Sequence, residues 1–166
     1  MKIYLYFKNE GWKLVEAKNK ELKKLLNERN IIIFDSATIG DYVSIGDSAM
    51  IGHSARIGDY TTIGHSARMD YFVTIGNFVT IGDYVKIGYY VKIGNYVKIG
   101  NYVKIGYYAK IDNSATIGDY ATIGDYTKIS DYTRIGNEFN KDGKDTFILI
   151  YPWKEAKRGL IQYKPT

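Results

Sequence analysis

An aliphatic side chain returns at every sixth position from residue 33 to residue 135, without a single insertion. Most of these residues are followed by Gly and preceded, two positions earlier, by Val, Ala or Thr, so a typical unit reads Ile-Gly-Asp-Tyr-Val-Lys. A short fixed period of this kind predicts a repeat architecture, in which each unit buries its apolar side chains against its neighbours. The eighteen positions are Ile33, Ile39, Ile45, Ile51, Ile57, Ile63, Met69, Ile75, Ile81, Ile87, Ile93, Ile99, Ile105, Ile111, Ile117, Ile123, Ile129 and Ile135.

Each hexad reads as a short strand followed by a turn. In Val85-Lys86-Ile87 two apolar residues flank a polar one, so an extended chain directs both apolar side chains to one side. The intervening Gly, Asp, Asn and Ser are turn residues, Gly because it tolerates positive φ and the others because they hydrogen-bond nearby backbone. A helix is excluded, since a glycine in every unit would destabilise it and the period of six would scatter the aliphatic residues.

This pattern resembles the hexapeptide-repeat family, whose fold is a left-handed parallel β-helix with three hexads in each triangular coil. The resemblance covers about two thirds of the chain and implies an all-β solenoid of six coils with an aliphatic interior, so that any site lies on the outside. We expect three parts: a strand and helix cap over 1–30, the β-helix over 31–136, and a C-terminal strand and cover segment over 137–166. The even style of the repeat also resembles hexapeptide-repeat proteins of bacteriophages and prophages.

The two ends depart from the repeat. Alternating apolar residues predict a strand at Lys2–Phe7 and a second at Trp12–Val15, and Leu22, Leu25 and Leu26 in helical spacing predict an amphipathic helix over Lys18–Asn30. We interpret this small α/β segment as a cap on the first coil, because an open coil exposes unpaired strand groups. The apolar run Thr146–Tyr151 predicts a strand on the last coil or on a neighbouring subunit. A short helix or irregular cover is expected over Trp153–Tyr163.

The net charge of +5 lies mainly in the terminal segments, because residues 31–136 carry nine Lys or Arg against ten Asp or Glu. The sequence therefore gives no strong nucleic-acid signal. The chain has no cysteine, which excludes disulfides and thiolate metal sites. It has neither a secretory h-region nor an apolar run of membrane length, so we expect a cytoplasmic protein with no membrane partner, in the host cytoplasm if it is phage-encoded.

Hexads three apart stack on one face, so the outward residues form three columns. The least charged column is Ser44, Thr62, Thr80, Lys98, Thr116 and Arg134. Family members are usually homotrimers, and burying charge is costly, so this face is expected to turn toward a threefold axis.

A lysine belt surrounds two coils: Lys86, Lys92, Lys98, Lys104 and Lys110 follow one another with no acidic residue between Tyr84 and Ile111. Corner tyrosines interleave with these cations, and this combination can hold nucleotides or polyphosphates by stacking and charge. The alternative is that the tyrosines stack on one another and the lysines keep the surface soluble. The candidate ligand-binding residues are Arg56, Arg68, Tyr71, Lys86 and Lys104.

The two histidines of the chain lie in a duplicated pentapeptide, Gly-His-Ser-Ala-Arg, at His53 and His65. Twelve residues apart, they should occupy two corners separated by roughly 15 Å, so within one chain they cannot share a metal. Met69 and Asp70 replace the usual Ile-Gly directly after the second copy, and such a local departure is typical of a functional site. Drift at a solvent-exposed corner is the alternative.

Two classes of function remain open. The first is a non-enzymatic trimeric binder without a cofactor, acting as an inhibitor or sequestering protein for a host protein or a nucleotide, or as a virion component. The second follows from the resemblance: an acyltransferase with acyl-CoA as co-substrate and His53 or His65 as general base. We favour the binder, because no loop interrupts the coils to enclose a substrate. No metal is expected, since zinc enzymes of this fold need three histidine ligands. Ice binding is not expected either, because the chain lacks the flat surface with two columns of threonine that this function requires.

Overall fold

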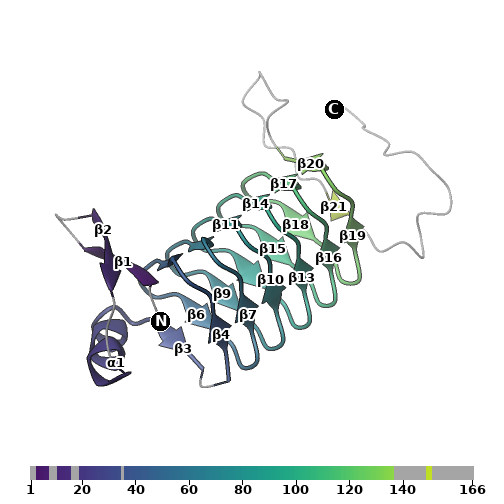
Figure 1. The fold of residues 1–166 in the computed structure, drawn as a ribbon. Helices are drawn as coiled ribbons and strands as arrows, with labels where there is room; N and C mark the ends of the chain where they lie inside the picture. Colours follow the sequence, from purple (N-terminus) through teal and green to yellow (C-terminus); the bar gives the residue numbers. More distant parts are fainter. Residues whose placement is uncertain (1–2, 8–10, 16–18, 35, 137–148, 151–166) are drawn as a thin grey trace, which may run out of the picture.

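Three parallel sheets form the sides of a triangular prism (Figure 1). The structure is a computed structural model and describes residues 3–7, 11–15, 19–34, 36–136 and 149–150. Each coil contributes one short strand to each sheet, so the chain winds as the expected left-handed parallel β-helix. The predicted fold class is therefore confirmed.

Sheet A contains β2 (Gly11–Val15), β1 (Ile3–Phe7), β5 (Val43–Ile45), β8 (Thr62–Ile63), β11 (Thr80–Ile81), β14 (Lys98–Ile99), β17 (Thr116–Ile117) and β20 (Arg134–Ile135). Sheet B contains β3 (Ile32–Ile33), β6 (Met50–Ile51), β9 (Arg68–Met69), β12 (Lys86–Ile87), β15 (Lys104–Ile105), β18 (Thr122–Ile123) and β21 (Leu149–Ile150). Sheet C contains β4 (Thr38–Ile39), β7 (Arg56–Ile57), β10 (Thr74–Ile75), β13 (Lys92–Ile93), β16 (Lys110–Ile111) and β19 (Lys128–Ile129).

Coils stack in a register of 18 residues. Lys86 pairs with Lys104, and Ile87 with Ile105, so identical positions of successive coils lie side by side. The Ile of each hexad and the Val or Ala two positions earlier point inward, and residues such as Ile63, Val85 and Ala115 have no exposed surface or almost none. The outward residue between them is solvated, which confirms the predicted columns of polar side chains.

In the turns, the glycine and the third residue have different roles, and the positive φ does not lie at the glycine where the sequence suggested it. Positive φ occurs at the third turn residue, as at Tyr84 (58°) and Tyr102 (59°), and, except at Gly136 (129°), not at the glycine that begins the turn. The glycine is required for a different reason: a Cβ on Gly46 would lie 2.6 Å from the backbone nitrogen of His65 in the next coil. Glycine therefore permits coils to approach closely, while the left-handed residue bends the chain.

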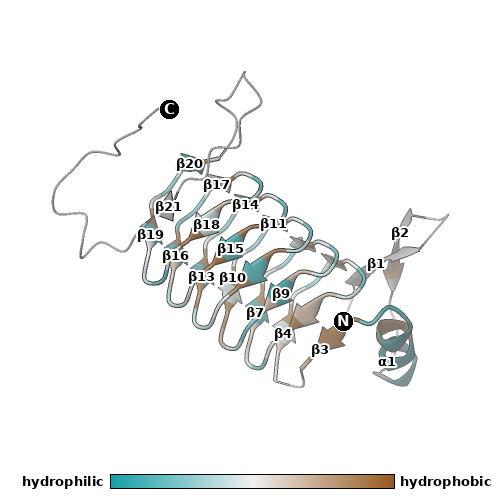
Figure 2. Cartoon of the chain, turned by 180° about the vertical axis from the view of Figure 1, so that it is seen from behind, coloured by the Kyte–Doolittle hydropathy of each residue, from teal (hydrophilic) through white to brown (hydrophobic). Residues whose placement is uncertain are grey.

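The N-terminal segment lies at the first coil. Strand β1 pairs in parallel with β5 and antiparallel with β2, so a hairpin extends sheet A beyond the repeats. Helix α1 (Asn19–Glu28) follows, and its Leu22 and Leu26 join the same apolar cluster as the coils. Its other face is hydrophilic, whereas β3 at the same end of the prism is hydrophobic (Figure 2).

At the C-terminal end, β21 pairs with β18 of the last coil, which agrees with part of the strand expected over Thr146–Tyr151. The cover segment expected over Trp153–Tyr163 lies outside the described residues. No helix in the described part of the chain is both long and apolar enough to cross a membrane.

Candidate functional site

A ladder of capping hydrogen bonds runs along two of the three corners of the prism. We call the corners A–B, B–C and C–A after the sheets that they connect. At the C–A corner the backbone N–H of Asp59 donates to Asn77 Oδ1 at 2.9 Å, and the N–H of Asn77 donates to Asn95 Oδ1 at 2.8 Å. The second turn residue is Asp or Asn in every coil here, because the short side chain places an acceptor oxygen beside the amide of the coil before it.

The B–C corner breaks this ladder. Its second turn residues are aromatic in four successive coils, and their rings contact one another: His53–Tyr71, Tyr71–Tyr89 and Tyr89–Tyr107 have ring centroids 5.4–5.5 Å apart. The pattern resumes only where the N–H of Tyr107 donates to Asp125 Oδ1 at 2.8 Å. A column of aromatic rings thus replaces the capping side chains over the middle of the prism.

His65 is part of the ladder at the A–B corner. Its Nδ1 accepts the backbone N–H of Asp47 at 3.1 Å, and its own N–H donates to Asp83 Oδ1 at 2.7 Å. Because Nδ1 holds the lone pair in this hydrogen bond, the proton of the neutral ring lies on Nε2. His65 therefore takes the place of Asp or Asn, and this arrangement is that of a structural residue.

His53 has different surroundings at the B–C corner. Its ring lies 4.2 Å from the ring of Phe34, between centroids, and its Nδ1 lies 3.3 Å from Ser36 Oγ. The same Ser36 oxygen accepts the N–H of Ser54 at 2.9 Å. Within residues 36–136 the structure gives Nε2 no hydrogen-bond partner. His53 is thus an exposed imidazole whose ring is held by Phe34 and Ser36, and no backbone amide of the described residues donates to it.

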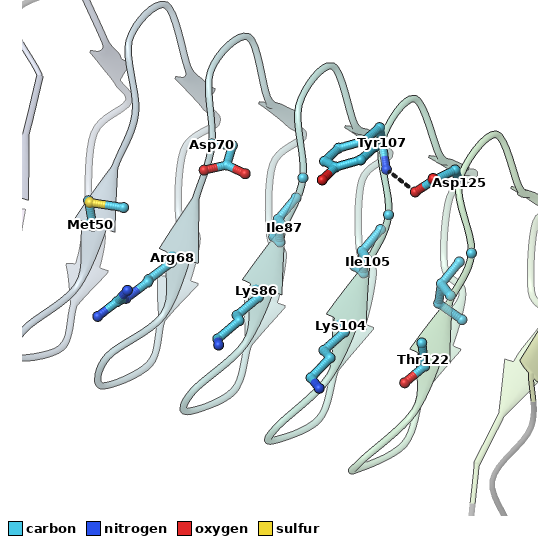
Figure 3. A pocket seen from close by; sticks show the side chains of 14 residues that line it. Met50, Arg68, Asp70, Lys86, Ile87, Lys104, Ile105, Tyr107, Thr122 and Asp125 are labelled. Carbon is cyan, nitrogen blue, oxygen red and sulfur yellow. Dashed lines mark hydrogen bonds between the residues drawn. The ribbon is translucent and has the colours of Figure 1, made fainter.

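A groove of about 620 Å³ follows sheet B beside the B–C corner. Arg68, Lys86 and Lys104 form one side of it as registered neighbours in β9, β12 and β15. Figure 3 shows these side chains in a row between Met50 and Thr122, opposite Asp70, Tyr107 and Asp125. The backbone of glycine turns, among them Gly88 and Gly106, completes the lining.

The charges on sheets B and C differ. On sheet C, Lys110 Nζ lies 2.7 Å from Asp112 Oδ1, and Lys128 Nζ lies 3.9 Å from Asp112 Oδ2. Arg68, Lys86 and Lys104 have no ion pair with any residue that the structure describes. Like charges opposite one another across strands are unfavourable, so the groove concentrates positive charge that an anionic ligand would neutralise.

Asp70 is the acidic residue nearest to the middle of the column. It stands where the adjacent coils have Gly52 and Gly88, and burial raises the pKa of its carboxyl. The charge of Asp70 in turn is the largest cause that raises the pKa of the Tyr89 hydroxyl. Asp70 and the aromatic column therefore share one electrostatic environment.

Of the residues predicted to bind ligand, the structure brings together Arg68, Lys86 and Lys104, with Tyr71 at the adjacent corner. Arg56 lies on sheet C, in register with Thr74, and so faces away from this groove. The two histidines lie at different corners, as expected. Five further lining residues were not among the predicted ligand-binding residues: Met50, Asp70, Tyr107, Thr122 and Asp125. In the sequence, Asp70 stands out only as a departure from the repeat, and rows of 18 residues place Met50 and Thr122 in the column of the three cations.

The corner tyrosines that we considered as stacking platforms stack on one another instead. Tyr90 and Tyr108 have centroids 4.9 Å apart and planes 7° apart, and Tyr84 and Tyr102 form an equivalent pair at the A–B corner. Within the described ranges, no group of three or more His, Cys, Asp or Glu side chains could hold a metal ion.

Residues 36–70 and 72–107 match the family model described as bacterial transferase hexapeptide (six repeats). No curated protein matches the chain.

Among solved structures, the acetyltransferase domain of PglB from Neisseria gonorrhoeae is 18% identical, with a TM-score of 0.37 over 70% of this chain and 62% of that one. The UDP-N-acetylglucosamine acyltransferase of Francisella novicida is 22% identical, with a TM-score of 0.44 over 64% of this chain and 57% of that one. The chain thus spans less than two thirds of the length of either structure. At this level of identity the likeness concerns the fold alone.

Proposed function

Because the chain belongs to the hexapeptide-repeat family, we propose that it transfers an acyl group from a coenzyme A thioester to a hydroxyl or amine, with His53 as general base. The observation that carries this proposal is the difference between the two histidines. His65 Nδ1 is held as a cap by the N–H of Asp47, whereas His53 is exposed and its ring is oriented by Phe34 and Ser36. We place the activity in the cytoplasm.

Ser36 gives His53 the orientation that a base needs. When Nδ1 carries the proton, Ser36 Oγ accepts it together with the N–H of Ser54, because a hydroxyl oxygen has two lone pairs. This tautomer leaves the lone pair on Nε2, which can remove a proton from the attacking hydroxyl or amine. Proton removal makes that atom a better nucleophile toward the thioester carbonyl, and the thiol then leaves.

The groove on sheet B supplies a place for the phosphates of the acyl donor. Arg68, Lys86 and Lys104 present three cations along one column, and a phosphate accepts charge-assisted hydrogen bonds from both kinds of side chain. His53 lies next to this groove, since its ring contacts Tyr71, which directly follows the lining residue Asp70. Both parts of the proposed site therefore lie at one edge of the prism.

The proposed assembly is a homotrimer that packs through sheet A. The outward residues Thr62, Thr80 and Thr116 leave this face less charged than the other two, so its burial costs less desolvation. Light scattering at micromolar protein should give three times the chain mass, and a monomer mass would refute the assembly.

Two histidine variants test the catalytic proposal. His53→Ala should lower the rate of acetyl transfer by about 10²-fold to 10⁴-fold, because it removes the general base. His65→Asn is the matched control: Asn101 already occupies the same column, so the cap on Asp47 and the activity should both survive. Equal activity of wild type and His53→Ala would refute the proposal, as would a loss confined to His65→Asn.

A second candidate is a non-enzymatic binder that sequesters a nucleotide in the same groove, in keeping with a phage-encoded inhibitor. The unpaired cations of sheet B favour it, since they serve a phosphate ligand with or without turnover. Calorimetry with coenzyme A and ATP, on wild type and on Lys86→Gln, distinguishes the two, with Lys98→Gln on sheet A as control. Salt-sensitive ATP binding that Lys86→Gln weakens, without acetyl transfer, would establish the binder.

A further inference from the structure

The B–C corner carries two adjacent columns of aromatic side chains, where each of the other corners carries one. The first column is Tyr71, Tyr89 and Tyr107, at the second turn position; the other is Phe72, Tyr90, Tyr108 and Tyr126, at the third. All seven are exposed. We call these seven residues the aromatic edge. The remaining corners place Asp, Asn or His beside their aromatic column, so only the B–C corner has two aromatic columns side by side.

The aromatic edge is formed at the expense of backbone caps. In the columns of the other corners, Asp or Asn accepts the N–H of the coil before it at 2.6–2.9 Å. A tyrosine lies 18 residues after His53, Tyr71 and Tyr89, and its ring offers no acceptor near the turn. A regular repeat that gives up three stabilising contacts to expose three rings departs from its own pattern where function is expected.

The rings of the second column cannot serve as stacking platforms. Phe72, Tyr90, Tyr108 and Tyr126 form a continuous stack, with centroids 4.8–5.1 Å apart and planes within 7°. Both faces of Tyr90 and Tyr108 are therefore covered by their neighbours, which leaves ring edges and hydroxyl groups to the solvent. Bases and sugars bind through ring faces, so this column does not suit a single-stranded nucleic acid or a glycan.

Cations flank the aromatic edge on both sides. Arg68, Lys86 and Lys104 lie on sheet B, and Lys92 is exposed on sheet C in register with Lys110. The nearby carboxylates, Asp70 and Asp125, belong to the coils at either end of the tyrosine column. The middle of the edge thus offers several hydroxyl and ammonium groups and one nearby carboxylate, that of Asp70. The excess of donors suits a partner rich in phosphate or carboxylate acceptors.

We propose that the aromatic edge docks on the surface of an anionic lipid bilayer. A straight convex corner buries little surface area against an extended peptide or nucleic-acid chain. It can insert into a layer of lipid headgroups, which then contact the corner and both adjoining sheets. Tyrosine favours the membrane–water interface, since its ring is apolar and its hydroxyl group remains hydrated. Long lysine side chains reach the anionic headgroups while their stems lie along the protein.

This contact requires no membrane-spanning segment, and it goes beyond acyl transfer without depending on it. The B–C corner lies opposite sheet A in the triangular cross-section, so a trimer packed through sheet A would leave the aromatic edge of each subunit exposed. Docking and assembly therefore use different surfaces of the prism.

Co-sedimentation with vesicles tests the proposal. The full chain should sediment with vesicles of phosphatidylcholine that contain phosphatidylserine and remain in solution with phosphatidylcholine alone. The triple variant Lys86→Gln, Lys92→Gln, Lys104→Gln should lower the partition coefficient on the order of 100-fold, because each basic residue near the surface contributes about fivefold. The matched control, Lys20→Gln, Lys23→Gln, Lys24→Gln, removes the same charge from α1 and should have little effect.

Aromatic variants separate the edge from general basicity. Phe72→Ser, Tyr90→Ser, Tyr108→Ser should weaken vesicle binding several-fold more than Tyr84→Ser, Tyr102→Ser, Tyr120→Ser, which removes three stacked rings from the A–B corner. Serine is already present in both columns, at Ser54 and Ser48, with the same positive φ. Equal losses in the two triple variants would overturn the proposal. So would binding to neutral vesicles, or an oligodeoxynucleotide that binds as tightly and with the same sensitivity to the variants.

Discussion

The same pentapeptide, Gly-His-Ser-Ala-Arg, occurs at two corners of this prism and has two different roles. At the A–B corner, His65 is a cap that accepts the N–H of Asp47 and lies below Asp83 in the ladder. At the B–C corner, His53 packs against Phe34 and has a tyrosine as its successor in the next coil. The local sequence is identical, so the difference comes from residues in the adjacent coils.

In a solenoid, therefore, the neighbours that define a side chain's role are those in the coil before and the coil after. Asp83 and Tyr71 are the equivalent neighbours of the two histidines, and only the aspartate accepts a hydrogen bond from the backbone N–H of its histidine. The residue in the following coil thus determines whether the backbone N–H of the histidine has an acceptor.

The largest expected effect comes from the core that supports both histidines. Ile63→Asp places a carboxylate where no surface is exposed, with no partner to compensate it. We expect a loss of at least about 3 kcal/mol in the free energy of unfolding. Circular dichroism during thermal unfolding measures it, with the exposed Thr74→Asp as control. An unchanged melting temperature for Ile63→Asp would contradict the inward placement of this column.

The second effect distinguishes the two histidines by stability. His65→Ala leaves the N–H of Asp47 without its acceptor and should cost about 1 kcal/mol. His53→Ala should cost less, since no backbone amide among the described residues donates to its ring, whereas that of Asp47 donates to His65. Chemical denaturation of both variants, with His65→Asn as the variant that keeps the acceptor, provides the comparison. A larger loss for His53→Ala would show that the roles are reversed.

A third experiment gives His53 the kind of neighbour that His65 has. In Tyr71→Asn, the new side chain can accept the N–H of His53, as Asp83 accepts that of His65. Amide hydrogen exchange at residue 53 should then slow by about tenfold, the equivalent of one ordinary hydrogen bond. Tyr71→Phe, which adds no acceptor near the turn, should leave the exchange rate unchanged. Equal rates in the two variants would show that the neighbour does not determine the cap.

The smallest effect concerns Asp70, which belongs to the coil that follows His53. Burial raises the pKa of its carboxyl, so the folded chain retains this proton to a higher pH than the unfolded chain. Ionised Asp70 therefore disfavours the fold, and wild type should lose stability relative to Asp70→Asn as the pH rises from the ordinary carboxyl pKa through the raised one. The side chain is only partly buried, so the difference should be small.

The same variant has a spectroscopic readout. Because the charge of Asp70 is the main cause of the raised pKa of Tyr89, Asp70→Asn should lower the pKa of that hydroxyl toward its ordinary value. An NMR titration of the Tyr89 ring measures this, and an unchanged pKa would place the cause elsewhere.

The fold was predictable because its period is local. Ile33 to Ile135 specify inward columns, and the residues between them specify outward ones, from spacing alone. The register of 18 also follows once three hexads per coil are assumed, which correctly separates Arg56 from Arg68. The pairing of β1 with β5 was not predictable, because no periodicity relates Ile3 to Val43.

The candidate site was predictable only in part. The cations Arg68, Lys86 and Lys104 follow from their column, but the structural role of His65 depends on a hydrogen bond with Asp47, and a single hexad contains no sign of it. The turn conformation was also not predictable from the sequence. The presence of glycine suggested a positive φ at Gly82, but the residue with a left-handed conformation is Tyr84. Such features arise from contacts between coils.

The register of 18 residues also determines which changes in length this chain can tolerate. Deletion or duplication of one whole coil returns every later hexad to its original sheet, so Lys104 would still follow Lys86 on sheet B. Loss of a single hexad instead rotates all later residues by one side of the triangle. Downstream threonine positions of sheet A would then continue a lysine column, and the aromatic edge would be divided between two corners. Tandem duplication of eighteen residues therefore keeps every later residue on its sheet, whereas duplication of six residues moves every later residue to another sheet.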